Sequence, residues 1–346
     1  MLIFHNDYNE MCHSSVLEKM ESCIGMQIPG YGRDAFCDAA ANQIRDLCGD
    51  NTLAVHFLVG GTQTNLTVID AALRAHQGVI SAASGHIHVH ETGAVEATGH
   101  KVLALPSEDG KLTAEQVRIA MESHLSDSDA EHTVQPKLVY ISNSTELGTI
   151  YYKQELEDLY NTCKQFGLYL FMDGARLGYA LTAPDNDLTL QDVARLTDVF
   201  YIGGTKCGAM FGEAVVISNP EIAADFRYLI KQHGGMLAKG WLLGLQFSAL
   251  MENNLYFLIC KKANDLAQDV RCAIIDAGFQ FLVPTTTNQI FPILSDKALK
   301  ILGEHVTFSE QGRVDKNHRA VRFCTSWASK PEDVNRLCQL IRSIKE

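Results

Sequence analysis

Two apolar segments of the chain lead into polar groups that could perform chemistry. Residues 169–172 are followed by Asp173, and residues 199–202 are followed by the segment Gly203-Gly204-Thr205-Lys206. Short runs rich in aromatic and β-branched residues are typical of buried strands in a parallel sheet. Ligands bind beyond the carboxyl ends of such strands. Asp173 and Lys206 are therefore predicted to serve one ligand site.

A carboxylate and a lysine at two strand ends are the pair that pyridoxal phosphate requires. The lysine forms a Schiff base with the cofactor, and the carboxylate keeps the pyridine nitrogen protonated so that the ring can accept electrons. Each motif also has a simpler interpretation, because Asp-Gly is commonly a turn and Gly-Thr-Lys is commonly a solvated loop. The two motifs together, in this order and each at a strand end, favour the cofactor site.

The segment Asp173-Gly174-Ala175-Arg176, followed by Gly203-Gly204-Thr205-Lys206, resembles the threonine aldolase and β-eliminating lyase family. This family lies in the aspartate-aminotransferase-like class (fold type I) of pyridoxal phosphate enzymes. The similarity extends from Asn6 to about Trp327, which is nearly the whole chain. It implies pyridoxal 5'-phosphate held as a Schiff base by Lys206. It also implies a large domain with a mostly parallel seven-stranded sheet between helices, plus a smaller C-terminal α+β domain.

The order of predicted elements also indicates an α/β protein. Helical segments such as 113–124 and 154–166 separate short strands, as expected for a largely parallel sheet. The strands of the large domain are expected at residues 54–59, 79–82, 102–105, 138–142, 168–172, 199–202 and 214–217. A long helical region, about 237–277, precedes three further strands near residues 280–283, 289–292 and 320–325.

These elements predict three parts of the chain. Residues 1–30 are expected to form an N-terminal arm and helix that pack on the small domain. Residues 31–245 are expected to form the large cofactor-binding domain, and residues 246–346 the small C-terminal domain.

Composition excludes several classes of protein. The formal charge of −12 argues against a nucleic-acid partner, which would call for clustered lysine and arginine. No apolar run approaches the ~20 residues of a membrane span, and the first residues lack the features of a signal peptide. The ten cysteines show no metal-ligand spacing, which indicates reduced thiols and a cytoplasmic location rather than a disulfide framework.

A glycine-rich turn between a strand and a helix could hold a phosphate. Gly61, Thr62 and Gln63 follow the strand at 54–59 and open a helix, whose first amides and dipole favour an anion. Many strand–helix turns share this composition without binding a phosphate. The family resemblance implies that this turn holds the cofactor phosphate, and that the hydroxyl of Thr205, just before the lysine, contacts it as well.

Three alternating histidines, His86, His88 and His90, follow the strand at 79–82. Such spacing can hold a metal ion on one side of a strand, but no matching ligand cluster is evident and no metal site is expected. The resemblance implies that His86 stacks on the pyridine ring close to the substrate hydroxyl. It also matches Glu91 to an acidic residue of the same segment, whereas His88 and His90 are expected to be packing residues.

An arginine between apolar strand residues, Arg322, could lie on a solvent-exposed face. Its guanidinium fork also suits a carboxylate. The family resemblance implies that Arg322, Arg176 and Asn6 bind the substrate carboxylate, with Asn6 standing where the family carries a serine. Arg176 is also expected to contact the cofactor.

The chain departs from the family pattern at two places. Many threonine aldolases carry a second active-site histidine after the strand at 138–142, but the segment here reads Thr145-Glu146-Leu147-Gly148. This departure leaves open the group that handles the hydroxyl proton, and the preferred diastereomer. Some relatives also place an arginine at the position of Leu237 to reach a phosphate across a subunit interface. Here Lys231 or Lys239 would have to supply that charge, and Lys231 is the predicted residue.

The resemblance implies an aldolase that cleaves L-threonine, L-allo-threonine and related β-hydroxy-α-amino acids to glycine and an aldehyde. Its catalytic residues would be Lys206, His86 and Asp173. The family assembles as tetramers built from dimers, so a homo-oligomer is expected. One alternative is another reaction on the same scaffold, such as β-elimination, racemisation or transamination. The other is a catalytically silent α/β binding protein.

Overall fold

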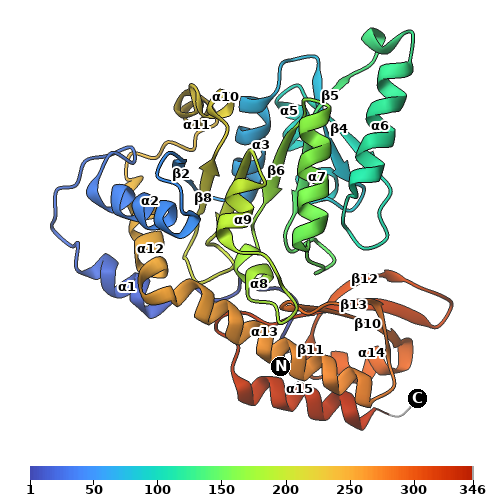
Figure 1. Cartoon of the computed structure of the whole chain (residues 1–346). Helices are drawn as coiled ribbons and strands as arrows, with labels where there is room; N and C mark the ends of the chain where they lie inside the picture. The colour runs from blue at the N-terminus through green and yellow to red at the C-terminus, as the bar shows by residue number, and fades with distance from the viewer. Residues whose placement is uncertain (345–346) are drawn as a thin grey trace.

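A computed structural model describes residues 1–344, and its larger part is built on a seven-stranded sheet (Figure 1). Six strands run in one direction, and only β8 is antiparallel to its neighbours β2 and β7. In spatial order the strands are β2 (Ala54–Leu58), β8 (Glu213–Ile217), β7 (Val199–Gly203), β6 (Tyr169–Asp173), β5 (Gln135–Ser142), β3 (Gln77–Ala82) and β4 (Lys101–Leu105). The mostly parallel seven-stranded sheet expected from the sequence is confirmed.

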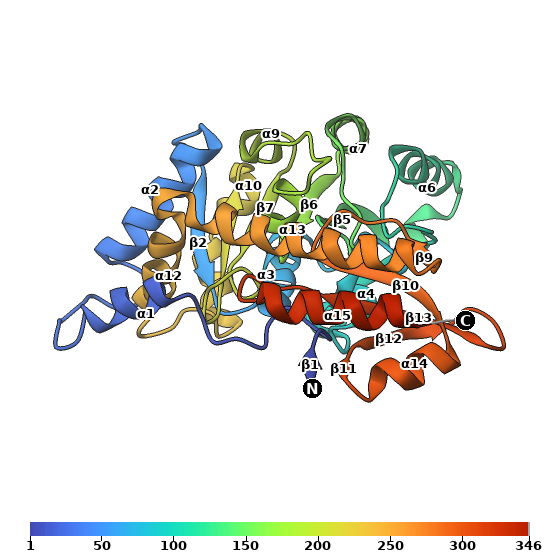
Figure 2. The ribbon, with the colours of Figure 1, turned by 90° about the horizontal axis from the view of Figure 1, so that it is seen from below.

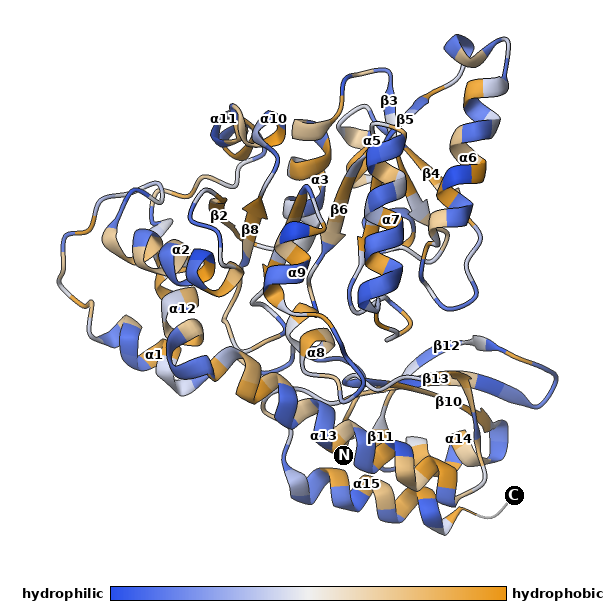
Figure 3. Ribbon diagram, in the orientation of Figure 1, coloured by the Kyte–Doolittle hydropathy of each residue, from blue (hydrophilic) through white to orange (hydrophobic). Residues whose placement is uncertain are grey.

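The central strands are apolar on both faces because each face packs against helices. Every residue of β3, β7 and β8 is buried. Successive side chains of a strand point to opposite faces. In β5, accordingly, Val139 and Ile141 belong to the larger hydrophobic cluster, whereas Leu138 and Tyr140 belong to the cluster on the other face. In Figure 3, β2 and β8 are coloured hydrophobic, whereas α7 (Lys153–Gln165) is largely hydrophilic.

Helices cover both faces of the sheet. Besides α7, the larger cluster draws buried side chains from α1 (Ser14–Glu21), α2 (Ala35–Cys48), α6 (Ala114–Ser126), α8 (Leu177–Leu181), α9 (Leu190–Arg195) and α12 (Trp241–Met251). The opposite face packs against α3 (Gly61–Ala72), α4 (His86–Val89), α5 (Ala94–Ala97), α10 (Pro220–Ala223) and α11 (Phe226–Gln232). No helix within residues 1–344 has both the length and the apolar character needed to cross a membrane.

The smaller part of the molecule is an antiparallel sheet packed against helices. Its strands, in spatial order, are β12 (Ser309–Arg313), β13 (His318–Cys324), β10 (Gln289–Ser295) and β9 (Gln280–Val283). The helices are α13 (Leu255–Asp276), α14 (Asp296–Gly303) and α15 (Pro331–Ser343). Seen from below, α13 and α15 lie side by side (Figure 2). The short strand β1 (Leu2–Ile3) pairs in parallel with β11 (Val306–Thr307).

The division of the chain differs from the predicted one at both boundaries. Leu2 and Phe4 belong to the smaller hydrophobic cluster, but Val16 of α1 belongs to the larger one, so only the first residues of the 1–30 segment pack on the small domain. The predicted boundary after residue 245 falls inside α12, whose Phe247 also belongs to the larger cluster. The transition lies within α13, where Cys260 packs in the larger cluster and Val270 in the smaller.

The single helical region predicted at 237–277 is interrupted. Asn253 and Asn254 have φ values of 53° and 59°, in the left-handed region, and they separate α12 from α13. Asparagine adopts this conformation more readily than most residues. The break redirects the chain so that α12 stays on the large sheet while α13 continues toward the small domain (Figure 1).

Register in the large sheet sets the positions of the site residues. Ser142 at the end of β5 lies opposite Asp173 at the end of β6. The ends of β6 and β7 approach so closely that a Cβ atom on Gly174 would lie 1.7 Å from the Tyr201 carbonyl oxygen, and one on Gly203 would lie 2.4 Å from that of Ala175. Glycine at both positions therefore allows Asp173 and Lys206 to lie at one edge of the sheet.

Candidate active site

A narrow slot opens at the carboxyl ends of β5 and β6. Its volume is about 40 Å³. The residues that line it are Gly61, His86, Ser142, Ser144, Glu146, Asp173, Ala175, Arg176, Tyr201 and Lys206. The structure thus brings together five residues predicted from the sequence to act in catalysis or binding: Gly61, His86, Asp173, Arg176 and Lys206.

Asp173 is buried and accepts four hydrogen bonds. Tyr140 Oη donates to Oδ2 at 2.6 Å and Asn65 Nδ2 donates to the same oxygen at 3.0 Å. The backbone N–H of Ala175 donates to Oδ1 at 2.9 Å, and Tyr201 Oη donates to it as well. Burial alone would raise the pKa of this carboxyl, but the charge on His86 and the tyrosine hydroxyls outweigh burial and lower it. Asp173 is therefore held as a carboxylate.

His86 lies at the start of α4 and pairs with a buried acid. Its Nδ1 is 2.7 Å from Glu91 Oε1, and Asn65 Nδ2 donates to that same oxygen at 2.8 Å. Burial favours the neutral ring, but the hydrogen bond to Glu91 and the charge on Asp173 raise the pKa of His86. The segment is a short helix rather than a strand, so His86 and His90 lie near each other, with ring centroids 5.6 Å apart.

Lys206 lies in the turn after β7, and the Tyr179 hydroxyl fixes this turn by donating to the Lys206 carbonyl oxygen at 2.6 Å. Burial and the charge on Arg176 lower the pKa of the Lys206 amine, although Asp7 and Asp173 oppose this effect. A lysine with a lowered pKa carries a larger fraction of the neutral amine, which is the nucleophilic form.

Thr205 does not point into the slot. Its hydroxyl donates to Glu213 Oε1 at 2.9 Å and accepts from the backbone N–H of Gly212 at 3.0 Å. The backbone N–H of Gly204 donates to the other oxygen of Glu213. Burial raises the pKa of Glu213 to about 8. These bonds fix the turn that carries Lys206, and the predicted contact of Thr205 with a phosphate stays a prediction.

The glycine-rich turn forms the start of α3, as expected. No side chain caps this helix, so the first N–H groups are open to an anion. Gly61 lines the slot and Thr62 is exposed. The Gln63 amide is engaged elsewhere, because it accepts from the backbone N–H of Val59 at 3.3 Å and donates to the carbonyl oxygen of His233 at 3.1 Å.

Arg176 forms a buried ion pair with Asp7. Its Nε donates to Asp7 Oδ2 at 2.7 Å and its Nη2 donates to Oδ1 at 2.9 Å. Asn288 Nδ2 also donates to Asp7, at 2.9 Å. Within residues 1–344, Arg176 Nη1 makes no hydrogen bond and is free to bind a ligand. Asn6 is buried beside this pair, but its Oδ1 accepts from the backbone N–H of Tyr8 and it lines neither the slot nor the larger cavity.

A larger cavity adjoins the slot and reaches the small domain. Its volume is about 670 Å³, and it shares His86, Glu146, Arg176 and Lys206 with the slot. Arg322 of β13 lines its far side. The Arg322 guanidinium donates to Gln289 Oε1 at 3.2 Å and to the His5 carbonyl oxygen at 3.1 Å, and its Nε is buried without a partner. Arg176 and Arg322 thus place two cations on one cavity that also contains Lys206.

We expect Asp7→Asn to destabilise the protein by about 3 kcal/mol, because it leaves the buried Arg176 charge unpaired. Burial raises the pKa of Asp7, but pairing with Arg176 outweighs it and lowers the pKa to about 2. At any pH above the ordinary pKa of an aspartate, the Asp7 carboxylate therefore contributes about 2 kcal/mol to the free energy of unfolding. This contribution is lost as the pH falls from about 4 toward 2.

Urea unfolding between pH 2 and 7 measures both effects. Asp265→Asn, which removes an exposed ion pair with Lys261, is the matched control and should change stability by less than about 0.5 kcal/mol. An Asp7→Asn protein as stable as the wild type would contradict the assigned ion pair.

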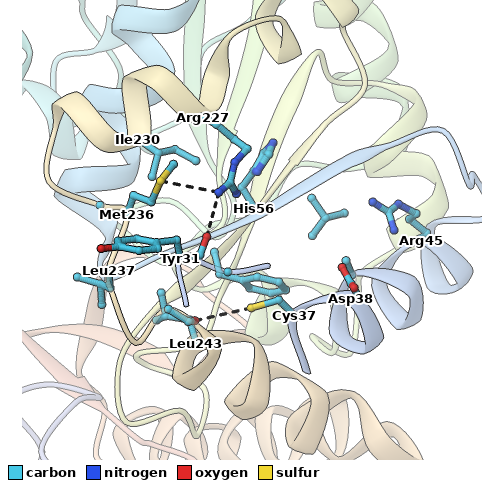
Figure 4. A pocket seen from close by; sticks show the side chains of 16 residues that line it. Tyr31, Cys37, Asp38, Arg45, His56, Arg227, Ile230, Met236, Leu237 and Leu243 are labelled. Carbon is cyan, nitrogen blue, oxygen red and sulfur yellow. Dashed lines mark hydrogen bonds between the residues drawn. The ribbon is translucent and has the colours of Figure 1, made fainter. Parts of the chain in front are cut away.

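The remaining predicted cation, Lys231, does not reach this site. It is exposed on α11, with its ammonium 5.1 Å from the Tyr31 ring centroid. Leu237 stands where some relatives carry a phosphate-binding arginine, and it lines a separate cavity of about 100 Å³ between α2, β2 and α11 (Figure 4). In that cavity Arg227 donates to the Tyr31 carbonyl oxygen at 3.0 Å and lies 3.8 Å from the Met236 sulfur. This cavity shares no lining residue with the slot.

Sequence reasoning missed several residues that organise the site. Asp173 is held by Tyr140, Tyr201 and Asn65. The two tyrosines lie within apolar strands and Asn65 lies within a helix, so the sequence pattern indicated only that they pack in the interior. Glu213 carried a clearer signal, because a carboxylate stands at the start of the apolar run 214–217. Asp7 directly follows Asn6, but nothing local in the sequence indicates its contact with a residue 169 positions away.

The comparisons with known proteins identify the family. The family model for β-eliminating lyases matches residues 15–297. The chain belongs to the β-eliminating lyase family. Within this family it is similar to the low specificity L-threonine aldolase of Pseudomonas sp. (strain NCIMB 10558), with 32% identity over 91% of this chain and 89% of the relative.

Solved structures with the same fold agree with this assignment. A threonine aldolase of Leishmania major is 45% identical, with a TM-score of 0.96 over 99% of each chain. An aspartate aminotransferase of Thermus thermophilus shares the fold at 15% identity, with a TM-score of 0.73 over 99% of this chain and 91% of that one. The fold is therefore that of the fold type I pyridoxal phosphate enzymes, and membership of the β-eliminating lyase family implies the same cofactor.

The residues of the slot fit pyridoxal phosphate. Asp173 is a buried carboxylate, Lys206 contributes an amine, and the start of α3 offers uncapped N–H groups. Ser144 Oγ is buried in the slot without a hydrogen-bond partner among residues 1–344, as expected if a ligand atom completes its contacts. A Cβ atom on Gly61 would lie 3.2 Å from the Tyr201 hydroxyl and would narrow the slot.

Proposed function

We propose that this protein is a pyridoxal-phosphate-dependent aldolase that cleaves L-threonine, L-allo-threonine and related β-hydroxy-α-amino acids to glycine and an aldehyde. One observation carries the proposal: Lys206 lies where the slot that contains Asp173 meets the cavity that contains Arg176 and Arg322. An amino acid bound there would have its carboxylate near two guanidinium groups and its amino group near Lys206.

Lys206, Asp173 and the start of α3 would hold the cofactor. The cofactor supplies an electron sink when it is bound. Lys206 attaches it covalently, Gly61 and Thr62 offer N–H groups to its phosphate, and the Asp173 carboxylate stabilises positive charge on the ring nitrogen. Asp173 already accepts four hydrogen bonds, so one donor must give way, and Tyr201, which lines the slot, is placed to do so.

The arginines orient the substrate. Arg176 uses two of its nitrogens on Asp7, which fixes the guanidinium plane and leaves Nη1 for the substrate carboxylate. Arg322 binds the other side of the carboxylate from the small domain. A carboxylate fixed in this way sets the Cα–Cβ bond relative to the ring, and this orientation determines which bond breaks.

The proposal is tested by product analysis. The purified protein with pyridoxal phosphate should release glycine and an aldehyde from L-threonine, L-allo-threonine and phenylserine. A β-eliminating reaction would instead release ammonia and a 2-oxo acid from a β-substituted amino acid. Release of ammonia without glycine across the panel would refute the aldolase assignment.

We further propose a cytoplasmic homo-oligomer, a dimer of dimers in which a neighbouring chain completes each site. All ten cysteines are free thiols, as expected in a reducing compartment. Lys231 and Lys239 are exposed and lie outside the slot, so a lysine contact to the phosphate would come from a neighbouring chain. Sedimentation at the assay concentration tests this assembly, and a fully active monomer would rule it out.

A further inference from the structure

We propose that Glu146 accepts the hydroxyl proton of the substrate during cleavage. This inference rests on the proposed aldolase function and assigns the group that takes the place of a second active-site histidine. Glu146 lies in the loop after β5 and lines both the slot and the larger cavity. It is therefore positioned between the cofactor side and the substrate side of the site.

The carboxylate of Glu146 is fixed through one oxygen only. Ser142 Oγ donates to Oε1 at 2.7 Å, and the backbone N–H of His86 donates to the same oxygen at 3.0 Å. Within residues 1–344, no hydrogen bond reaches Oε2. Since the residue lines both cavities, Oε2 is an oriented acceptor that is free to bind a hydroxyl.

The other acids around the site are already engaged. Asp173 accepts four hydrogen bonds, and Asp7 is paired with Arg176 and Asn288. Glu91 accepts from His86 and Asn65 through one oxygen; its second oxygen has no partner but is buried, and Glu91 lines neither cavity. His86 itself is a weaker acceptor, because its pairing with Glu91 stabilises the cationic ring. Glu310 lines only the larger cavity and is paired with Arg319. Among residues 1–344, Glu146 is thus the acid that lines both cavities and has an open oxygen.

Electrostatics favour this role. Burial and the charge on Asp173 raise the pKa of Glu146, whereas the Ser142 hydroxyl lowers it. A carboxylate with a raised pKa is a stronger base. The titratable and charged groups near it are His86, Asp173, Tyr140, Tyr151, Arg176 and Lys206.

The step balances without a further reactant. Glu146 Oε2 takes the proton of the β-hydroxyl, the O–H electron pair forms the C=O bond of the aldehyde, and the Cα–Cβ bond breaks. The electron pair of the broken Cα–Cβ bond stays with the Cα fragment, where the negative charge of Asp173 helps the cofactor to stabilise it. A proton from the Lys206 ammonium then completes glycine. Glu146 releases the hydroxyl proton to solvent and Lys206 takes one proton back from solvent, so no net proton is gained or lost. No atom is oxidised or reduced by an outside reagent.

Glu146→Gln tests the proposal, because an amide keeps an oxygen for the Ser142 and His86 donors but cannot take up the proton. We expect glycine release from L-threonine to fall about 10²- to 10⁴-fold. Exchange of the α-hydrogen of glycine in D₂O does not involve a hydroxyl and should stay within about threefold of wild type. Glu122→Gln, an exposed change on α6, is the matched control and should alter neither reaction.

A second variant tests the pH dependence of cleavage, which would not change if Glu146 had only a structural role. Ser142→Ala removes a donor to the charged form of Glu146, which raises its pKa, so the acidic limb of kcat/KM for L-threonine should shift to higher pH. Equal losses of cleavage and α-hydrogen exchange in Glu146→Gln, near-normal cleavage in it, or an unmoved limb in Ser142→Ala would overturn the proposal. Wild-type protein that exchanges glycine yet cleaves no β-hydroxy amino acid would instead overturn the proposed function.

Discussion

Lys206→Ala is expected to reduce turnover at least about 10³-fold, which corresponds to about 4 kcal/mol of transition-state stabilisation. The reason is that Lys206 contributes an amine to both the slot and the larger cavity, and the pKa of this amine is lowered by burial and by Arg176. The purified wild-type protein should be yellow, and borohydride should fix the cofactor on the peptide that contains Lys206.

Two observations control this experiment. Lys261→Ala, which changes an exposed lysine on α13, should leave turnover unchanged. The Lys206→Ala protein can still bind the cofactor through the start of α3. Its absorbance spectrum should therefore show bound cofactor even though its turnover is lost. Borohydride labelling of a different lysine would show that the assignment is wrong.

Asp173→Asn is expected to lower kcat on the order of 10²-fold or more, about 2.7 kcal/mol. The amide removes the negative charge that keeps the ring nitrogen protonated. It also leaves the donors Tyr140, Tyr201 and Asn65 facing a group that can no longer satisfy all of them. Steady-state kinetics on protein with measured cofactor content gives the comparison.

Tyr140→Phe is the graded partner of this variant. It removes one hydrogen-bond donor, which raises the pKa of Asp173, but it keeps the carboxylate. The effect on kcat should therefore be smaller than that of Asp173→Asn, which removes the negative charge. The kcat of Tyr140→Phe should lie between those of the wild type and Asp173→Asn. If Asp173→Asn retains cofactor and turns over at nearly the wild-type rate, the carboxylate has no electrostatic role.

The large sheet could be predicted from the sequence because its strands are buried on both faces. A run such as 199–202 must then be apolar at every position, and it ends where Gly203 permits close packing. The edge strand β12 was not predicted, since its residues, Ser309–Arg313, are polar and four of the five are exposed. The break at Asn253 was also missed, because polar residues such as Asn253 and Asn254 can also stand on the exposed face of a continuous helix.

The candidate site could be predicted only where a motif is local. Asp173 and Lys206 each stand at the end of a recognisable strand. Asp7 and Glu146 depend on contacts that the local pattern does not encode: Asp7 meets Asn288 at a separation of 281 residues. The role of Glu146 depends on the path of the loop that brings it to the His86 backbone.

The Asp7 contact also has a consequence for the order of events during synthesis. The carboxylate that fixes Arg176 is made among the first residues, yet Asn288, which holds it, emerges from the ribosome 281 residues later. Arg322 is made later still. The strands β2 to β8 can pair before then, but the substrate side of the site must remain unfinished on the nascent chain. We therefore expect ribosome-bound chains that stop before residue 288 to be inactive even where the large sheet has formed.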